Sequence, residues 1–234
     1  MAIDYSGADN LEVMLEAKRY NGFLKLLVSR FSGDPGTALD FGAGIGTFTS
    51  ALTLPISQVT CVEPDTQARA FLQTLGYNTH ADISEVEAQF DYIFSLNVLE
   101  HIEDDRAAAR QLFERLKPGA TVFIYVPAFN HLRTSMDDLV GHHRRYTRNT
   151  LEAVLKDAGF TVEQARYTDF LGYFATLVFK ALEQFKGEPD GKINKPLLIV
   201  YDRVIFPISR ILSVPFSLLI GKNVYAVARR PLTD

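Results

Sequence analysis

Residues 37–49 read Thr-Ala-Leu-Asp-Phe-Gly-Ala-Gly-Ile-Gly-Thr-Phe-Thr, and the rest of the chain takes its place from them. The apolar start predicts a short buried strand, followed by a glycine loop and the first turn of a helix. Gly42, Gly44 and Gly46 let the backbone turn sharply and approach a ligand where a Cβ would stand in the way. A helix that starts here offers free backbone N–H groups to a polar ligand.

The acid before the loop distinguishes this pattern from the dinucleotide-binding fingerprint. That fingerprint has its glycines at the first, third and sixth positions, whereas Thr47 takes the sixth position here. Asp40 stands two residues before the first glycine and suits a ligand that carries an amine or another cation. A tight turn that binds nothing is the alternative. The pattern resembles motif I of the class I S-adenosylmethionine (SAM) dependent methyltransferases, which implies that SAM is cradled by Asp40, Gly42, Ala43, Gly44 and Gly46.

A second acid follows the next predicted strand, residues 58–62. Glu63 comes 23 residues after Asp40, and a carboxylate at this place can accept hydrogen bonds from both ribose hydroxyls. The resemblance assigns Glu63 to the ribose of SAM, with Pro64 beside it. Asp65 suits the other role of an acid here, the N-cap of the following helix.

Two further segments complete the expected cofactor site. Asp82 and Ile83 follow a brief third strand, and the resemblance gives Asp82 to the adenine amino group, with an apolar neighbour against the ring. Residues 97–101, Asn-Val-Leu-Glu-His, follow a buried strand and resemble the family's motif IV region. Ligands of open α/β sheets bind beyond the carboxyl ends of the strands, where strand order reverses. We therefore expect the segment from Asn97 to His101 to lie beside the sulfonium, with Asn97, Val98 and His101 as candidate cofactor contacts.

An amphipathic helix or helix pair is predicted over residues 8–31. Its segment 17–21 resembles the N-terminal helix of many methyltransferases, in which such residues close over bound SAM. Tyr20 is therefore a candidate cofactor contact, and ordinary packing against the sheet is the alternative.

Strands alternate with helices along most of the chain, including helices at 48–54 and 103–116 and a fifth strand at 120–126 after a Lys-Pro-Gly hinge. This alternation predicts an α/β fold with a doubly wound sheet. The family resemblance places the last β run, 223–228, antiparallel beside the fifth strand. We expect a mostly parallel, seven-stranded, Rossmann-like sheet with an α-helical C-terminal addition. The expected parts are a SAM-binding core with its N-terminal helix (1–167), an apolar helical insertion (168–221), and a final strand with its tail (222–234).

The segment 127–146 carries three of the five histidines and follows the fifth strand, on the acceptor side of the expected pocket. Its run Gly-His-His-Arg-Arg-Tyr resembles a signature of a methyltransferase-11/12-like subgroup often found near glycan or lipid pathways. A hydroxyl acceptor needs a base, and histidine titrates near neutrality. His142 or His143 is the first candidate base and His101 the second, with Asp137 placed to orient an imidazole.

Two other interpretations of this segment stay open. The adjacent histidines and Asp137 could bind zinc, but their spacing matches no known site, so no metal site is assigned. In a purely structural loop, Arg144 or Arg145 would pair with Asp137 or Asp138.

The composition is that of an ordinary folded protein, with 47% hydrophobic and 22% charged residues. A net charge of −4 and a pI near 5.8 give no broad attraction to a phosphate backbone, so no nucleic-acid partner is expected. The single cysteine, Cys61, forms no internal disulfide and is expected to fill the core. Residues 1–5 lack the features of a signal peptide, and together these observations predict a cytoplasmic location.

Apolar runs at 169–185 and 197–220, separated by a polar linker at 186–192, set the tail apart. Asp202, Arg203 and Arg210 argue against a membrane span. Three roles remain for these helices: to cover the pocket, to pack on a second subunit in a homodimer, or to rest on a bilayer surface as a peripheral membrane contact.

The sequence thus predicts a SAM-dependent methyltransferase that acts on a small-molecule or lipid- or glycan-linked acceptor. The apolar tail favours a hydrophobic acceptor, and the histidines favour transfer to oxygen. The rival functions are a nicotinamide-dependent oxidoreductase, a SAM-binding protein without transferase activity, and a membrane-associated scaffold built on the tail.

Overall fold

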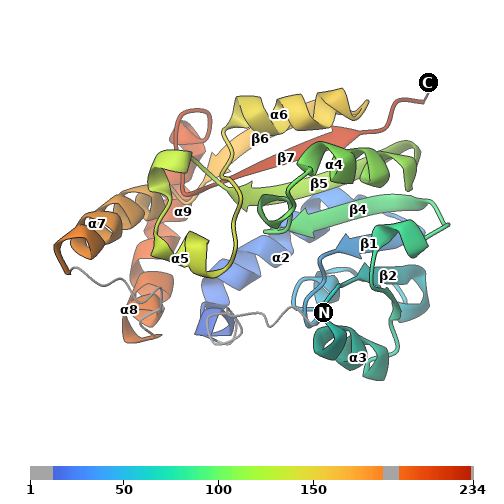
Figure 1. The fold of residues 1–234 in the computed structure, drawn as a ribbon, viewed down its shortest axis with the longest axis horizontal. Coiled ribbons are helices and arrows are strands. Elements are labelled where there is room, and N and C mark those ends of the chain that lie inside the picture. The colour runs from blue at the N-terminus through green and yellow to red at the C-terminus, as the bar shows by residue number, and fades with distance from the viewer. Residues whose placement is uncertain (1–12, 187–194, 233–234) are drawn as a thin grey trace.

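The computed structural model describes residues 13–186 and 195–232. Helices cover both faces of a central sheet, and further helices lie beyond one end of the strands (Figure 1). The start of the predicted N-terminal helix, residues 8–12, and the polar linker at 187–192 lie outside the described residues. The strands are β1 (Ala38–Phe41), β2 (Val59–Val62), β3 (Asn78–His80), β4 (Phe90–Leu96), β5 (Leu116–Pro127), β6 (Thr161–Thr168) and β7 (Asn223–Arg229).

The sheet has seven strands in the order β3-β2-β1-β4-β5-β7-β6. β1 pairs in parallel with β2 and β4, β4 pairs in parallel with β5, and β7 runs antiparallel between β5 and β6. This confirms the predicted fold class, including the antiparallel last strand beside the fifth. Strand order reverses between β1 and β4, so a ligand site is expected at their carboxyl ends.

Helices pack on both faces of the sheet, with α4 and α6 on one face and α2 on the other (Figure 1). The α-helices are α2 (Lys18–Ser32), α3 (Thr66–Thr74), α4 (Asp105–Glu114), α5 (Ser135–Leu139), α6 (Arg148–Asp157), α7 (Phe170–Lys186), α8 (Lys195–Val200) and α9 (Phe206–Phe216). Short 3-10 turns are η1 (Thr49–Ala51), η2 (Ile56–Gln58), η3 (Ile83–Glu85), η4 (Leu99–His101) and η5 (Asn130–Leu132), and η6 (Tyr201–Ile205) is a π-helical turn.

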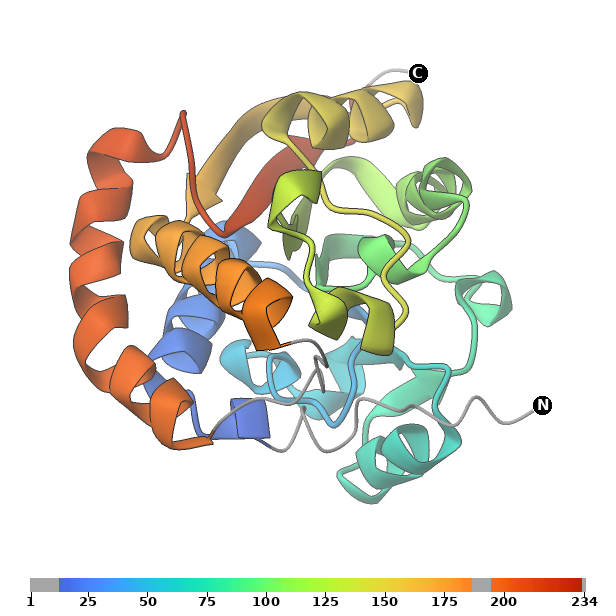
Figure 2. The same cartoon turned by 60° about the vertical axis from the view of Figure 1, so that its left-hand side comes forward.

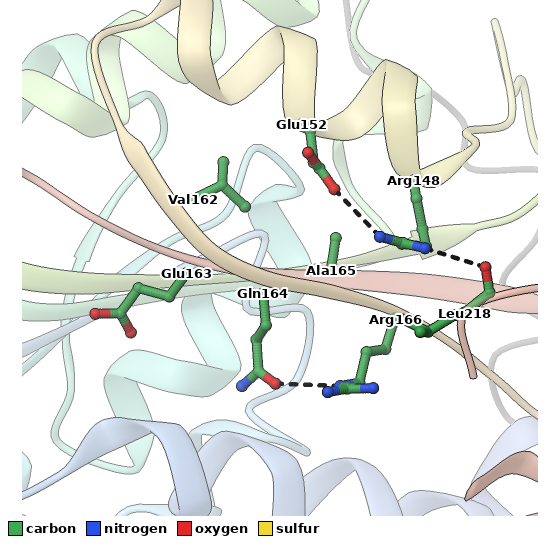
Figure 3. Close-up of a pocket in the computed structure, with 8 residues that line it drawn as sticks. All are labelled: Arg148, Glu152, Val162, Glu163, Gln164, Ala165, Arg166 and Leu218. Carbon is green, nitrogen blue, oxygen red and sulfur yellow. Dashed lines mark hydrogen bonds and ion pairs between the residues drawn. The ribbon is translucent and has the colours of Figure 1, made fainter. Parts of the chain in front are cut away.

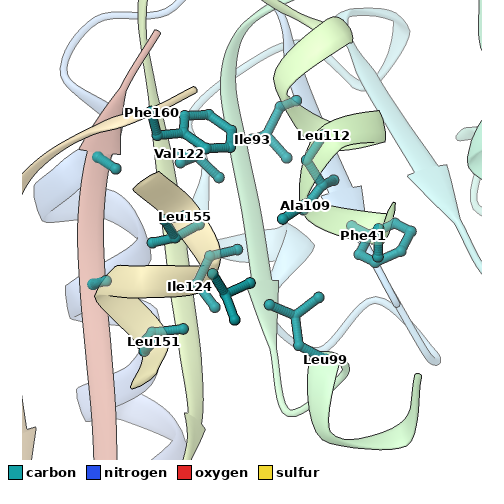
Figure 4. Packing of buried hydrophobic residues seen from close by; sticks show 14 of the residues in the cluster. Phe41, Ile93, Leu99, Ala109, Leu112, Val122, Ile124, Leu151, Leu155 and Phe160 are labelled. Atoms are coloured by element: carbon teal, nitrogen blue, oxygen red, sulfur yellow. The ribbon is translucent and has the colours of Figure 1, made fainter. Parts of the chain in front are cut away.

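The core follows from the two-residue period of the strands. In β5, Val122 and Ile124 face α4 and α6, whereas Phe123 and Tyr125 face α2. Figure 4 shows the first of these layers, in which side chains of the helices meet those of β4 and β5. Each fully buried large apolar side chain contributes roughly 1.5–3 kcal/mol. Cys61 is fully buried in β2, as expected of a core residue.

Two predicted elements differ from the structure. The helix expected at 48–54 is reduced to the 3-10 turn η1, because few residues lie between the glycine loop and Pro55 and a short helix is not stable by itself. The fifth strand starts at Leu116, since the Lys-Pro-Gly hinge forms a bulge in which Gly119 has a φ of 79°. The helix expected at 103–116 spans Asp105–Glu114.

The C-terminal helices α7, α8 and α9 lie together on one side of the molecule (Figure 2). No helix within residues 13–186 or 195–232 is long and apolar enough to cross a bilayer. The region from α7 to the residues after α9 nevertheless exposes many large apolar side chains. We call these the C-terminal apolar face: Val178, Leu182, Leu197, Val204, Ile208, Ile211, Val214 and Leu219.

Candidate active site

The glycine loop lies at the carboxyl end of β1, where strand order reverses. Gly42 has a φ of 82°, and a Cβ there would overlap Cγ2 of Val98, so the loop packs directly on the segment that follows β4. Gly46 has a φ of 80°, and its Cβ would press on Leu72. At Gly44, with a φ of 55°, no described heavy atom lies within 4 Å of the corresponding position. The loop is therefore supported at both ends and open in its middle.

Asp40 lies in β1 with 2% of its surface exposed. Its Oδ2 accepts a hydrogen bond from Oγ1 of Thr49 at 2.6 Å. Burial raises the pKa of Asp40 to about 7; the hydrogen bond from Thr49 opposes this shift and the nearby Glu63 adds to it. A cationic ligand would favour the ionised form of this carboxyl.

Glu63 holds the glycine loop. Its Oε2 accepts from the backbone N–H of Gly44 at 2.7 Å, and its Oε1 accepts from the backbone N–H of Asp65 at 2.9 Å. Burial raises the pKa of Glu63 in spite of these hydrogen bonds. Asp65 is the N-cap of α3, the role that the sequence assigned to it.

The arrangement fits a cationic nucleoside. β1 and β2 are neighbours, so the parallel pairing brings Asp40 and Glu63 to the same edge of the sheet. Each carboxylate oxygen of Glu63 has a second lone pair for a ligand hydroxyl. No described heavy atom lies within 4 Å of the Cβ position of Gly44, so the loop is open to a ligand beside Glu63.

The other expected cofactor contacts follow the carboxyl ends of β2, β3 and β4. Asp82 caps η3 by accepting from the backbone N–H of Ser84, while Ile83 is buried in the core. Asn97 is exposed at a left-handed φ of 56° directly after β4. The carbonyl of Pro64, which is itself exposed, accepts a hydrogen bond from Arg69.

Tyr20 takes part in packing beneath the C-terminal helices. Its hydroxyl lies 3.3 Å from the Tyr125 hydroxyl, and its ring meets Phe206 edge-on. These contacts agree with the alternative role of Tyr20, ordinary packing against the sheet.

A second cluster lies close to the glycine loop, since η4 follows the Val98 that Gly42 contacts. The rings of His101 and His142 meet edge-on with centroids 4.6 Å apart. Nδ1 of His142 lies 2.7 Å from Oδ1 of Asp137, so Asp137 orients this imidazole as the sequence suggested. His143 is exposed, and its backbone N–H donates to the carbonyl of Glu100.

Asp137 also matches the structural interpretation of the loop. Arg145 binds it through Nε at 2.7 Å and Nη2 at 2.9 Å. Burial would raise the pKa of Asp137, but the hydrogen bonds from His142 and Arg145 outweigh it and hold the pKa well below its usual range. Arg144 instead pairs with Asp105.

Glu100 is a residue that the sequence analysis did not single out. Its side chain is fully buried, and neither carboxylate oxygen has a hydrogen-bond partner among the described residues. Burial raises the pKa of Glu100 to about 8, although Arg145 acts in the opposite direction. Burial likewise lowers the pKa of His101 to about 4, with the neighbouring His142 adding to the shift. The sequence offered one signal for Glu100 as a site residue, namely its charge within the run Asn-Val-Leu-Glu-His.

A surface hollow of about 290 Å³ lies elsewhere, between α6 and β6 (Figure 3). Arg148 reaches Glu152 at 3.8 Å and donates to the carbonyl of Leu218 at 3.1 Å. Arg148 thus has a partner within the hollow, Glu152, and no predicted site residue lines the hollow.

Known proteins resemble this chain in sequence. A family model described as a methyltransferase domain matches residues 16–165. A trans-aconitate 2-methyltransferase of Deinococcus radiodurans is 30% identical over 130 residues, which cover 53% of this chain and 47% of that protein. The chain spans about half or less of the length of the curated relatives that it matches.

Solved structures share the fold. A Haloferax volcanii methyltransferase in complex with the Trm112 methyltransferase activator superimposes with a TM-score of 0.67 at 15% identity, covering 99% of this chain and 98% of that one. Phosphoethanolamine N-methyltransferase 2 of Haemonchus contortus, in complex with SAM, gives a TM-score of 0.58 at 21% identity, covering 88% and 52%. The resemblance to the methyltransferase-11/12-like subgroup stays a prediction, since these matches do not separate subgroups. The matched domain, found on this sheet order and around this glycine loop, shows that the chain belongs to the class I SAM-dependent methyltransferases, whose cofactor is S-adenosylmethionine.

Proposed function

We propose that the protein transfers the methyl group of SAM to an oxygen atom of a small-molecule or lipid- or glycan-linked acceptor. The observation that carries SAM binding is the pair of buried carboxylates, Asp40 and Glu63, at the carboxyl ends of neighbouring strands beside a glycine loop that is open at Gly44. Transfer to oxygen is supported by His142 with its partner Asp137. A ligand with a sulfonium and an ammonium group offsets the burial that raises both pKa values.

Each acid has its own part. Asp40 faces the cationic end of the cofactor, and Glu63 accepts from the ribose hydroxyls while it holds Gly44. Asp82 and Ile83 receive the adenine, and Asn97 and Val98 border the reacting centre. SAM supplies a methyl group already activated on sulfur, so the main task of the chain is placement, which can contribute several kcal/mol.

The cluster beyond β4 serves the acceptor. His142, held at Nδ1 by Asp137, keeps Nε2 for the proton of an acceptor hydroxyl. Asp137 then stabilises the imidazolium, and its own bond to Arg145 fixes its position. His101, whose pKa is lowered, is the weaker base, and the exposed His143 is not one of the three residues whose ligand atoms converge.

An apolar acceptor is favoured by the surroundings of this cluster. After β5 the chain places Phe129 on the ring of Tyr167 with centroids 4.7 Å apart, and His131 within 3.0 Å of the Tyr173 hydroxyl in α7. The C-terminal apolar face includes the exposed Val178 and Leu182 of α7. We therefore propose that the insertion at 168–221 covers the acceptor side of the core at 1–167, and that residues 222–234 form a third part, whose strand β7 lies between β5 and β6.

Contact with a second subunit or with a bilayer would use the same face. Sedimentation velocity would reveal a homodimer, and flotation with liposomes would reveal a peripheral membrane contact.

The test uses tritiated SAM and a panel of hydroxyl, carboxylate and amine acceptors. Amines are included because the Haemonchus neighbour is an N-methyltransferase, and carboxylates because the Deinococcus relative acts on trans-aconitate. We expect label in acceptors that offer oxygen, and a fall of about 10²–10⁴-fold in kcat for His142→Ala. His143→Ala is the matched control and should leave turnover unchanged. Label in amines alone contradicts transfer to oxygen, and SAM binding without label in any acceptor supports a binding protein without transferase activity.

A further inference from the structure

Three potential metal ligands converge beyond the end of β4. Among the described residues, one ligand atom from each of Glu100, His101 and His142 lies within 4.8 Å of the others. Oε1 of Glu100 is 3.9 Å from Nε2 of His142. Glu100 and His101 come from η4, whereas His142 comes from the loop after α5.

The second nitrogen of His142 is already engaged. Nδ1 of His142 meets Oδ1 of Asp137 at 2.7 Å. Metal-binding histidines almost always donate their other N–H to a carboxylate or a backbone carbonyl. This contact leaves Nε2 of His142 for the cluster, where it lies 3.9 Å from Oε1 of Glu100.

Glu100 is the independent sign of a ligand. The side chain is fully buried, and both of its oxygens lack hydrogen-bond partners among the described residues. A buried carboxyl without partners is costly whether it is ionised or neutral. The arrangement of the two histidines alone does not relieve this cost, because Nε2 of His142 is too distant for a hydrogen bond.

We propose that Glu100, His101 and His142 bind one divalent transition-metal ion of the zinc class. The ion satisfies the carboxylate of Glu100 and takes the free lone pairs of both imidazoles. Nitrogen and carboxylate donors together suit zinc and its neighbours better than magnesium or calcium.

The required movement is small. Donors that bind zinc at about 2.0–2.2 Å are separated from one another by roughly 3.0–3.5 Å. Side-chain rotations therefore close the 3.9 Å between Glu100 and His142, and the other separations of up to 4.8 Å, to that range. Two histidines and one glutamate leave a coordination position open, as in catalytic zinc sites.

The open position gives the metal a role that rests on the proposed function. An acceptor hydroxyl bound there would release its proton to water more readily, and His142 would then be a ligand rather than the base. Metal binding itself does not depend on transferase activity, so the two claims are tested apart.

The experiment uses full-length protein without a histidine tag, stripped with a chelator and dialysed. Calorimetric titration with ZnCl2 should show one equivalent bound, and Co²⁺ should give a visible d–d band that reports the coordination number. Glu100→Gln and His142→Ala should weaken zinc binding by more than about 100-fold, and Asp137→Asn by about 10–100-fold. His143→Ala, which changes an exposed neighbour of the same type, should leave the affinity within about twofold. Circular dichroism verifies that each variant is folded.

Absence of zinc binding by the wild type would overturn the proposal. So would equal affinity in the wild type, Glu100→Gln and His142→Ala, or an equal loss in His143→Ala. A parallel SAM titration separates the claims: SAM binding without zinc binding removes the metal site alone, and zinc binding without SAM binding removes the proposed function alone.

Discussion

Asp202 accepts a hydrogen bond from the backbone N–H of Tyr20 at 2.8 Å and so joins η6 to the first turn of α2. Its second oxygen accepts from the N–H of Arg19 at 3.0 Å. Ala17, the local N-cap, offers no side-chain hydrogen bond, so a carboxylate from the far end of the chain supplies the cap.

We expect Asp202→Ala to lower the free energy of unfolding by about 1–2 kcal/mol, because two N–H groups lose their acceptor. Asp202→Asn keeps an acceptor and should cost less. Urea denaturation measures both. Asp138→Ala is the control, since it removes an exposed ion pair with Arg133 and should cost less than about 1 kcal/mol. An equal cost for Asp138→Ala and Asp202→Ala would contradict the capping role.

Gly44 and Gly33 form a matched pair. Both have a left-handed φ, 55° and 65°, and neither has a described heavy atom within 4 Å of the Cβ position. Alanine at Gly44 should therefore cost about 1–2 kcal/mol of stability, and alanine at Gly33 at least as much, because its ψ of −131° adds to the strain. Gly44→Ala should in addition weaken SAM binding by about tenfold or more, because its Cβ fills the open part of the loop, and a tenfold change corresponds to about 1.4 kcal/mol. Calorimetry with SAM checks this, and equal SAM affinity in both variants would place the cofactor elsewhere.

SAM affinity should depend on pH through Asp40. The pKa of this carboxyl is raised to about 7 by burial, and a cationic ligand favours the ionised form. Below pH 7 binding must therefore release a proton, so affinity should rise with pH by up to about tenfold per unit and level off above pH 7. Glu63, whose pKa is also raised, acts in the same direction.

The variant Asp40→Asn provides the control for this pH dependence. It should bind SAM more weakly and with a flatter pH profile, as measured by calorimetry from pH 5.5 to 8.5. A wild-type affinity that falls with rising pH in this range would refute the placement of Asp40.

Zinc should raise the melting temperature of the metal-free protein. A ligand at 100 times its Kd stabilises the folded state by about 2.7 kcal/mol. Glu100→Gln should show no such shift, and Mg²⁺ should have little effect on the wild type because it prefers oxygen ligands. Differential scanning fluorimetry makes the comparison, and an equal zinc shift in the wild type and Glu100→Gln would count against the site.

The fold was predictable because its signals are local. A buried strand, three glycines at alternate positions and an acid 23 residues further on specify the first half of the sheet. Parallel strands end at the same edge, so the approach of Asp40 and Glu63 followed from the pattern. The short helix predicted over 48–54 was wrong, because the few residues before Pro55 form only the 3-10 turn η1.

The histidine cluster and the cap of α2 depend on contacts between distant residues, which the sequence pattern does not encode. His142 lies near Glu100 because β5 runs parallel to β4 and ends at the same edge of the sheet. Just after β5, Ala128 bridges to Tyr146, and the N–H of His143 donates to the carbonyl of Glu100. The spacing of these residues in the sequence matches no known metal-binding motif, so it did not predict that Glu100 and His142 lie close together. The cap from Asp202 on α2 joins residues 182 positions apart, a separation at which periodicity carries no information.

Titration of SAM into the purified protein tests the central claim most directly. We predict one equivalent bound by the wild type, and affinities about 10–100-fold weaker in Asp40→Ala and in Glu63→Ala, since each loses a charge-assisted contact. No binding by the wild type, or the same affinity in all three proteins, would contradict the account.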